Sequence, residues 1–219
     1  MSEGLILSRI ISKQLALQLP FRGGKRRGAG RKPKAGKALV SHAARPRFER
    51  ITPAHVMLKA RRDAPSLRSS RRFAAIRDAF VAARGLHGMR LIEFAVQGEH
   101  VHLIVEADNN QSLSRGMQGL CVRIARAVNR ASGRIGTLFA DHYHSRLLKS
   151  PTELVTAIRY VLTNAEHHFG DPGPDCCSSL AANAAPAVAA PQSWLFTLGW
   201  RLGRWPKGGP PRSSRYARE

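Results

Sequence analysis

Two histidines at the start of an apolar run are the feature that most constrains the fold of this chain. His100 and His102 flank Val101, and the run continues to Val105 shortly after Gly98, which favours a turn. Branched aliphatic residues at this density predict a buried β-strand. Residues two apart on a strand point to the same face, so both imidazoles would project side by side. Two neutral imidazoles on one strand form half of a metal site, although polar residues on the open face of a half-buried sheet give the same pattern.

The patterning on either side of this strand predicts a small α+β domain. In chain order we expect a strand at 53–59, a helix at 67–84, strands at 89–96 and 100–106, a helix at 112–131, a strand at 137–149 and a helix at 151–169. The short link at Gly98 favours a hairpin of the second and third strands. The order β-α-β-β-α-β, with a helix appended, is that of a ferredoxin-like antiparallel sheet. Two helices would cover one face of this sheet and leave the other face for chemistry.

The charge of the chain indicates what it binds. Thirty-six Lys and Arg residues against fourteen Asp and Glu residues give a formal net charge of +22, and nucleic acid is the default partner of such a field. No apolar segment is long enough to span a bilayer, and Arg9 and Lys13 interrupt residues 5–19, which faintly resemble a signal sequence. Three cysteines without a Cys-x-x-Cys spacing support neither a disulfide framework nor a zinc knuckle. We therefore expect a cytoplasmic, nucleoid-associated DNA-binding protein without a membrane partner.

Composition divides the chain into a basic disordered arm at 1–47, a folded domain at 48–170 and an Ala/Pro/Gly-rich basic tail at 171–219. The arm has ten basic and no acidic residues between positions 22 and 47, and its glycines and prolines predict an extended, disordered segment. Such a segment suits the minor groove of DNA or phosphate contact without preference. Its DNA-binding candidates are Arg26, Arg27, Arg31, Lys32 and Lys34. We expect the tail to be poorly ordered, with its three tryptophans free for base stacking or part of a small docked element.

The helix predicted at 112–131 adds a second basic surface. Its apolar residues recur every three or four positions, and four arginines fall on the opposite side of the helix. These are Arg115, Arg123, Arg126 and Arg130. Because no acidic residue stands among them, they predict contact with a phosphate backbone, although an ordinary solvated helix face has the same periodicity.

The last predicted helix supplies the other half of the site. Tyr160 and Asn164 are four residues apart and therefore share one helix face. Laid beside the open face of the sheet, this helix would bring Tyr160 over His100 and His102 and add an oxygen ligand from Asn164. Two imidazoles and an amide oxygen suit Mg²⁺ or Mn²⁺. Such an ion would polarise a phosphodiester for attack by the phenol.

Four blocks of sequence carry a resemblance to a known family. They are VQGEHVHLIVE at 96–106, LSRGMQ at 113–118, FADHYH at 139–144 and RYVLTN at 159–164. Across about residues 48–169 the chain resembles the HUH transposases with a single catalytic tyrosine, above all the REP-associated tyrosine transposases and their insertion-sequence relatives. That family has a ferredoxin-like fold, so the resemblance and the patterning agree on the fold class.

The resemblance implies a transposase that cleaves and rejoins single-stranded DNA, often beside a hairpin. Tyr160 would attack the phosphorus and hold the 5′ phosphate as a phosphotyrosine, leaving a free 3′ hydroxyl. His100, His102 and Asn164 would hold Mg²⁺ or Mn²⁺. The partner would be hairpin-containing single-stranded DNA, and the resemblance allows a homodimer whose subunits complete each other's sites.

Three other interpretations fit parts of this pattern. A non-catalytic, domesticated DNA-binding protein of the same fold would keep the arm and the arginine face, but binding alone needs none of the four site residues. His142 and His144 flank Tyr143 as a second histidine pair. This pair lacks the aliphatic run, and strand alternation would turn Tyr143 away from its histidines. A metal-dependent hydrolase that uses water as its nucleophile would share the same ligands.

Overall fold

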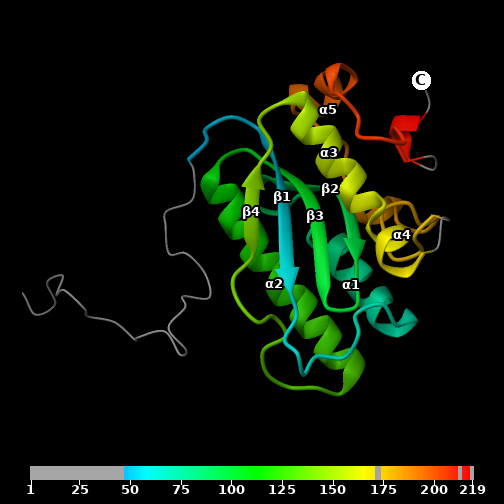
Figure 1. Ribbon diagram of the computed structural model, residues 1–219. Helices are drawn as coiled ribbons and strands as arrows, with labels where there is room; N and C mark the ends of the chain where they lie inside the picture. The colour runs from blue at the N-terminus through cyan, green and yellow to red at the C-terminus, as the bar shows by residue number, and fades with distance from the viewer. Residues whose placement is uncertain (1–46, 171–173, 212–213, 218–219) are drawn as a thin grey trace, which may run out of the picture. The chain divides into compact units, whose positions relative to one another are not determined.

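Four antiparallel strands form the sheet around which the domain is built. The computed structural model describes residues 47–170, 174–211 and 214–217. The strands are β1 (Thr52–Lys59), β2 (Met89–Val96), β3 (His100–Ala107) and β4 (His144–Leu147). They lie in the order β2-β3-β1-β4, and every neighbouring pair is antiparallel (Figure 1). This order, with a helix after β1 and another after β3, is the ferredoxin-like fold that the sequence predicts.

β2 and β3 form the hairpin expected from Gly98. The backbone N–H of Gln97 donates to the carbonyl of His100 at 2.7 Å, which closes the turn. All of β3 beyond His100 is buried, from Val101 to Ala107. A strand with both of its faces buried needs cover on both sides of the sheet, and the helices and the tail supply that cover.

The fourth strand is shorter than predicted. Its continuous ladder with β1 covers only His144–Leu147, within the expected 137–149, and Phe139 adds an isolated bridge to Ala60. The backbone N–H of His142 donates to the Asp141 carboxylate at 2.7 Å, and such a local bond competes with a strand ladder. The sequence was therefore right about the presence of this strand and wrong about its length.

Two long helices cover one face of the sheet (Figure 1). They are α1 (Ser70–Ala82) and α2 (Asn110–Ser132), and a single-turn helix, η2 (Leu86–Gly88), leads into β2. The side chains of Ser69 and Asn109 cap α1 and α2, because each accepts a hydrogen bond from the backbone N–H three residues later. Between these helices and the sheet lies the larger of two cores, which includes Val56, Phe80, Phe94, Leu103, Met117 and Leu120.

A third helix lies on the opposite face of the sheet (Figure 1). This is α3 (Pro151–Leu162), whose first turn is capped by the Ser150 side chain. Its apolar side packs on Ile92, Ala95 and Ile104 in a second core. Helices therefore cover both faces of the sheet. α3 lies on the face that the sequence analysis expected to stay open for the active site.

The sequence predicts one helix over 151–169, and this prediction is wrong. Thr163 leaves helical geometry at φ −104° and ψ 7°, and a separate helix, α4 (Asn164–Phe169), follows. The hydroxyl of Thr163 donates to the carbonyl of Arg159 at 2.8 Å. Threonine side chains that bond back to the preceding turn bend or end helices.

Residues 174–211 and 214–217 pack on the domain, although the sequence predicts a poorly ordered tail. The backbone N–H of Val96 donates to the carbonyl of Cys177 at 2.8 Å, and that of Ser179 donates to Phe94 at 2.9 Å. These bonds extend the sheet beside β2. Four short helices follow: η3 (Ala185–Ala187), α5 (Trp194–Thr197), η4 (Gly199–Leu202) and η5 (Arg215–Ala217).

Aromatic residues of the tail complete the second core, between the tail and α3. Phe196 and Tyr216 are buried there, and Trp200 and Trp205 pack against the same cluster. Trp194 is about half exposed, at 55%. Of the two roles considered for the tryptophans, a small docked element is therefore the arrangement found for two of the three.

Buried carboxylates fasten the tail to the sheet. Glu106, with no exposed surface, accepts hydrogen bonds from the backbone N–H groups of residues 192 and 193 at 2.7 and 2.9 Å. Glu93 accepts one from the Tyr216 hydroxyl at 3.1 Å and pairs with Arg215 at the same distance. Burial raises the pKa of Glu93, while the guanidinium of Arg215 opposes that shift. The tail is thus held by polar contacts as well as by its aromatic residues.

Candidate active site

His100 and His102 lie side by side on β3, as residues two apart on a strand should. Their ring centroids are 6.2 Å apart and their planes are inclined by 21°. His102 is buried at 4% exposure, while His100 is partly exposed. Nδ1 of His100 lies 3.7 Å from the Glu99 carboxylate. The pair therefore stands at the edge of the core, with one ring inside and one facing outward.

Tyr160 lies against this pair from α3. Its ring meets the ring of His102 edge-on, with centroids 5.4 Å apart at 89°. The apolar residues on the neighbouring face of α3 pack on the sheet, so the helix holds the phenol beside the histidines. Tyr160 itself is 50% exposed, which leaves it open to a substrate.

A third histidine, His55 on β1, completes the ring cluster and was missed by the sequence analysis. Its Nε2 lies 3.4 Å from Nδ1 of His102. Its ring is 5.5 Å from that of His102 and 5.7 Å from that of Tyr160. Burial and the positive charge of Arg146 lower the pKa of His55. The available signal was a lone histidine inside the apolar strand 53–59. Only the β1–β3 register, which pairs His55 with Ile104, places it diagonally beside His102.

Asn164, the remaining predicted ligand, is the first residue of α4. It is buried at 3% exposure, and its Nδ2 has no hydrogen-bond partner among the residues that the structure describes. An unpaired NH₂ group is a donor and calls for an acceptor such as a phosphate oxygen, whereas a cation would be bound by the amide oxygen. Nδ1 of His100 faces the Glu99 carboxylate, and Nδ1 of His102 faces His55. This mixed nitrogen and oxygen donor set fits a divalent cation such as Mn²⁺ or Mg²⁺.

A cavity of about 430 Å³ opens beside Tyr160 and His55. Arg146 and Glu153 line it and form an ion pair at 2.8 Å. The pKa of Glu153 lies below its ordinary value. The main cause is the hydrogen bond from the backbone N–H of Lys149, and the second is the hydrogen bond from Arg146. The side chain of Arg146 is 72% exposed, so a cation stands at the mouth of the cavity where an anionic substrate would enter.

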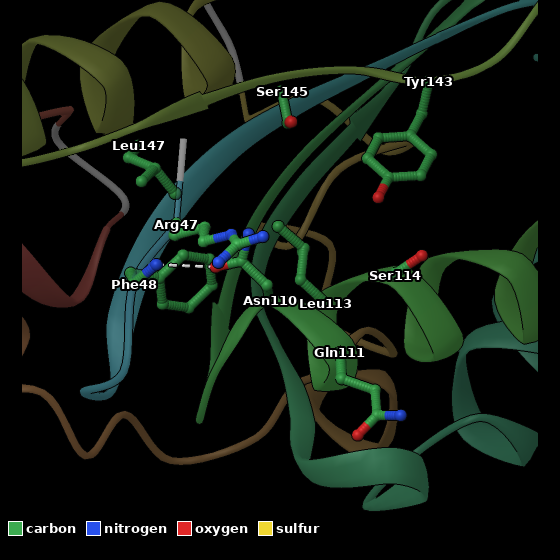
Figure 2. A pocket seen from close by; sticks show the side chains of 9 residues that line it. All are labelled: Arg47, Phe48, Asn110, Gln111, Leu113, Ser114, Tyr143, Ser145 and Leu147. Atoms are coloured by element: carbon green, nitrogen blue, oxygen red, sulfur yellow. Dashed lines mark hydrogen bonds between the residues drawn. The ribbon is translucent and has the colours of Figure 1, made fainter. Parts of the chain in front are cut away.

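The second tyrosine considered, Tyr143, lies elsewhere. It lines a cavity of about 440 Å³ at the start of α2, together with Arg47, Asn110 and Ser145 (Figure 2). Tyr143 packs against the core beneath α1 and α2, whereas the core of α3 lies on the other face of the sheet. The structure thus separates Tyr143 from the cluster of His55, His102 and Tyr160.

The structure brings three of the four predicted arginines of α2 into one groove. Arg123, Arg126 and Arg130 line a cavity of about 520 Å³ between α1 and α2, together with Arg71. Its floor consists of alanines, and Asp78 is the acidic residue in the lining. Arg115 is exposed but does not line this groove. The arm candidates at 26–34 lie outside the described residues.

One other group of side chains in the described part of the chain could hold a metal ion. Asp175, Cys176 and Cys177 place their ligand atoms within 4.8 Å of one another. However, Asp175 is already paired with Arg68 at 2.8 Å, and burial raises the pKa of Cys177 to about 12. Mg²⁺ and Mn²⁺ prefer oxygen ligands to thiols, so this group ties the tail to the domain through the Asp175–Arg68 pair rather than offering a centre for these ions.

Residues 54–164 match the family model described as IS200-like transposase. The match covers more than half of the 219 residues and runs from β1 to Asn164. The chain belongs to the IS200-like transposase family. All four residues of the predicted site, His100, His102, Tyr160 and Asn164, fall inside the matched range of this transposase.

A solved structure shares the fold of this IS200-like transposase. It is a REP-associated tyrosine transposase bound to a REP hairpin, with 14% identity, a TM-score of 0.51 and coverage of 70% of this chain and 93% of that chain. At this identity it shows the fold alone. A candidate transposase from Deinococcus radiodurans is also similar, with 16% identity, a TM-score of 0.40 and coverage of 52% and 91%. No curated protein matched the chain.

No helix among the described residues is both long and apolar enough to cross a membrane.

Proposed function

We propose that this transposase cleaves and rejoins single-stranded DNA through a 5′-phosphotyrosine intermediate on Tyr160. The observation that carries the proposal is the contact of Tyr160 with His102, beside His100, with ring centroids 5.4 Å apart. A half-exposed phenol next to paired imidazoles suits covalent attack on phosphorus. These residues lie together within one chain, which supports a site formed by a single subunit.

In the proposed reaction, the phenol oxygen of Tyr160 bonds to phosphorus while the bond from phosphorus to the 3′ oxygen breaks. The phenol proton passes to solvent, which reaches Tyr160 because half of the residue is exposed. The departing 3′ oxygen takes up a proton and becomes a free hydroxyl. Attack by a 3′ hydroxyl on the phosphotyrosine reverses these steps and rejoins the strand.

His100, His102 and Asn164 would hold Mg²⁺ or Mn²⁺, which would supply polarisation of the phosphodiester and neutralisation of developing charge. Arg146, at the mouth of the cavity beside Tyr160, is placed to pair with a phosphate of the bound strand. Its existing pair with Glu153 is solvent-exposed and therefore weak enough to exchange.

The proposed substrate is single-stranded DNA that carries a hairpin. The REP hairpin in the solved relative supports this choice, as does the net charge of +22. The groove lined by Arg71, Arg123, Arg126 and Arg130 is a proposed second contact for phosphates. We propose the same for Arg115 and for the arm residues Arg26, Arg27, Arg31, Lys32 and Lys34.

The proposal is tested with His100→Ala combined with His102→Ala. Cleavage of a hairpin oligonucleotide in Mn²⁺ should vanish, while salt-sensitive binding persists, because the arm and the groove are untouched. The matched control is His142→Ala with His144→Ala, the other histidine pair, which should cleave like the parent. Full cleavage by the first variant, or cleavage undiminished by EDTA, contradicts the metal assignment. A parent that binds but never cleaves supports a non-catalytic DNA-binding protein instead.

Deleting residues 1–47 tests the arm separately. Ten basic residues lie between positions 22 and 47. If all ten contact phosphates of a single strand, the slope of log affinity against log salt falls by about 7. Turnover of bound substrate should change little. An unchanged slope shows that the arm does not touch DNA.

A further inference from the structure

The groove between α1 and α2 lies on the face of the sheet away from Tyr160. Arg123, Arg126 and Arg130 of α2 line it together with Arg71 of α1. These two helices cover one face of the sheet, whereas Tyr160 stands on α3, which covers the other (Figure 1). We infer that the groove binds the sugar-phosphate backbone of double-stranded DNA, on a duplex separate from the strand that Tyr160 cuts. The inference rests on the proposed function only in taking the groove as a phosphate contact.

The spacing of the arginines on α2 matches the phosphates of a duplex. Arg123, Arg126 and Arg130 are three or four residues apart and therefore share one face of the helix. At about 1.5 Å per residue they span about 10 Å of the helix axis. Phosphates of one DNA strand follow one another about every 3.4 Å along the duplex axis, so the three guanidinium groups extend over about three base-pair steps. Arg71 adds a fourth guanidinium from the opposite wall of the groove.

The guanidinium groups of the groove are not neutralised by carboxylates of the protein. Three of the four form no ion pair or side-chain hydrogen bond within the described part of the chain: Arg71, Arg126 and Arg130. Arg123 donates to the backbone carbonyl of Gly119 at 3.0 Å. Asp78, the acidic residue in the lining, lies 3.6 Å from Arg77, outside the lining. Like charges gathered in one groove repel one another, and a polyanion bound there removes that repulsion.

The floor of the groove favours a duplex over a single strand. Six alanines form it: Ala74, Ala75, Ala79, Ala82, Ala127 and Ala131. The described residues that line the groove include no aromatic side chain, whereas proteins that hold single-stranded DNA combine basic residues with aromatic rings on which the bases stack. A duplex keeps its bases paired inside and presents its backbone, which guanidinium groups beside a floor of methyl groups can bind. Such backbone contacts carry no sequence information.

An acidic protein segment is the other occupant to consider, because guanidinium groups also pair with carboxylates. Protein interfaces, however, draw most of their affinity from large side chains anchored in pockets, and a floor of alanines holds no such anchor firmly. The net charge of +22 likewise favours nucleic acid. Double-stranded DNA is therefore the occupant that the groove fits best.

The position of the groove separates this duplex from the cut strand. Tyr160 contacts His102 on the α3 side of the sheet, and the sheet with its larger core lies between this contact and the groove. A hairpin stem that adjoins the cut stays near Tyr160, on the other face. The groove is thus open to a second DNA while the cleavage site is occupied.

The test compares two triple variants of the full chain. Arg123→Gln, Arg126→Gln and Arg130→Gln together remove three charges from the groove and keep polar side chains of good helix propensity. The matched control removes three charges from exposed arginines that do not line the groove: Arg50→Gln, Arg62→Gln and Arg84→Gln. Thermal unfolding establishes that both variants fold before any comparison is made.

The first readout is binding of a labelled blunt duplex of mixed sequence, measured by fluorescence anisotropy without divalent metal between about 50 and 200 mM salt. Each phosphate contact contributes about 0.9 to the slope of log affinity against log salt, so the groove variant should lose about 2.7 of the slope that the control keeps. Over this range the affinity of the control should fall about 40-fold more than that of the groove variant. Equal slopes overturn the inference. So does a groove variant that loses binding of polyglutamate but not of the duplex, the result expected of an acidic protein partner.

The second readout repeats the duplex titration after both variants are saturated with unlabelled hairpin oligonucleotide. The difference in slope should persist, because the hairpin oligonucleotide occupies the other face. If the difference disappears, the stem of the cut strand fills the groove, and the inference is overturned. These titrations need neither metal nor cleavage. Absence of the Tyr160 adduct in the parent would therefore refute the proposed function and leave the assignment of the groove unchanged.

Discussion

Replacing Glu106 with alanine should loosen the tail from the sheet. Glu106 is fully buried on β3 and accepts hydrogen bonds from the backbone N–H groups of Gln192 and Ser193 at 2.7 and 2.9 Å. Ser193 is the N-cap of α5, and α5 carries Phe196 into the core beneath α3. The Glu106 carboxylate thus holds the tail at the start of α5, from where the tail packs against α3, the helix that carries Tyr160.

The cost follows from the groups that lose their acceptor. A buried N–H left unpaired costs about 1–3 kcal/mol. Ser193 is buried, whereas Gln192 is exposed and its N–H can bond water, so Glu106→Ala should lower the free energy of unfolding by about 1–3 kcal/mol. Arg90 adds little, because it keeps its ion pair with Asp108 at 2.7 Å. Glu106→Gln keeps one acceptor oxygen and turns an NH₂ group toward the other N–H, so about half of that loss is expected.

Urea denaturation of the parent and both Glu106 variants measures these differences. Asp78→Ala is the control, since this carboxylate is 73% exposed and surface changes usually stay within about 0.5 kcal/mol. Limited proteolysis should cut Glu106→Ala first between residues 174 and 211. A loss of unfolding free energy below about 1 kcal/mol, or one equal to that of Asp78→Ala, would refute the role of Glu106 in holding the tail.

Two further predictions concern titratable groups. Burial raises the pKa of Cys121 to about 11 and that of Cys177 to about 12, while Cys176 is exposed, so a thiol reagent at pH 8 should label Cys176 rapidly and the other two only after denaturation. Rapid labelling of Cys177 would show that the tail does not pack as described. The pKa of Glu153 is lower in the folded chain, so its contribution is present above the ordinary carboxylate pKa and lost as pH falls through the folded value. Glu153→Gln should therefore lower the melting temperature at pH 7, with parent and variant converging as the pH falls below the folded pKa of Glu153; parallel curves would contradict this.

The sheet could be predicted because its signals are local. The aliphatic run after His100 and the turn at Gly98 lie within a few residues, and the helical spacing before and after them fixes the order of elements. The hairpin and the ferredoxin-like order follow from these features alone. The spacing of Tyr160 and Asn164 is also a local signal. The helix break at Thr163 could not be predicted, because it depends on whether the Thr163 hydroxyl bonds to the carbonyl of Arg159.

The tail and His55 could not be predicted because their partners are distant in sequence. Glu93 and Glu106 read as isolated acids in apolar strands, and only the folded chain brings residues 179–216 to them. An Ala/Pro/Gly-rich composition has few periodic signals. The tail packs through aromatic residues, and the sequence pattern does not show where these residues lie in the fold. His55 likewise joins the ring cluster only through the register of β1 on β3, which places it diagonally beside His102.

The covalent adduct of DNA with Tyr160 tests the central claim most directly. A single-stranded hairpin oligonucleotide labelled on the 3′ side of the cut is incubated with protein and Mn²⁺ and run on a denaturing gel. The parent and Tyr143→Phe should each carry the labelled fragment through its 5′ phosphate. Tyr160→Phe keeps the ring and its packing but lacks the attacking oxygen, so it should fold and give no adduct. An adduct formed by Tyr160→Phe, or none formed by a folded parent on any hairpin substrate, would contradict the account.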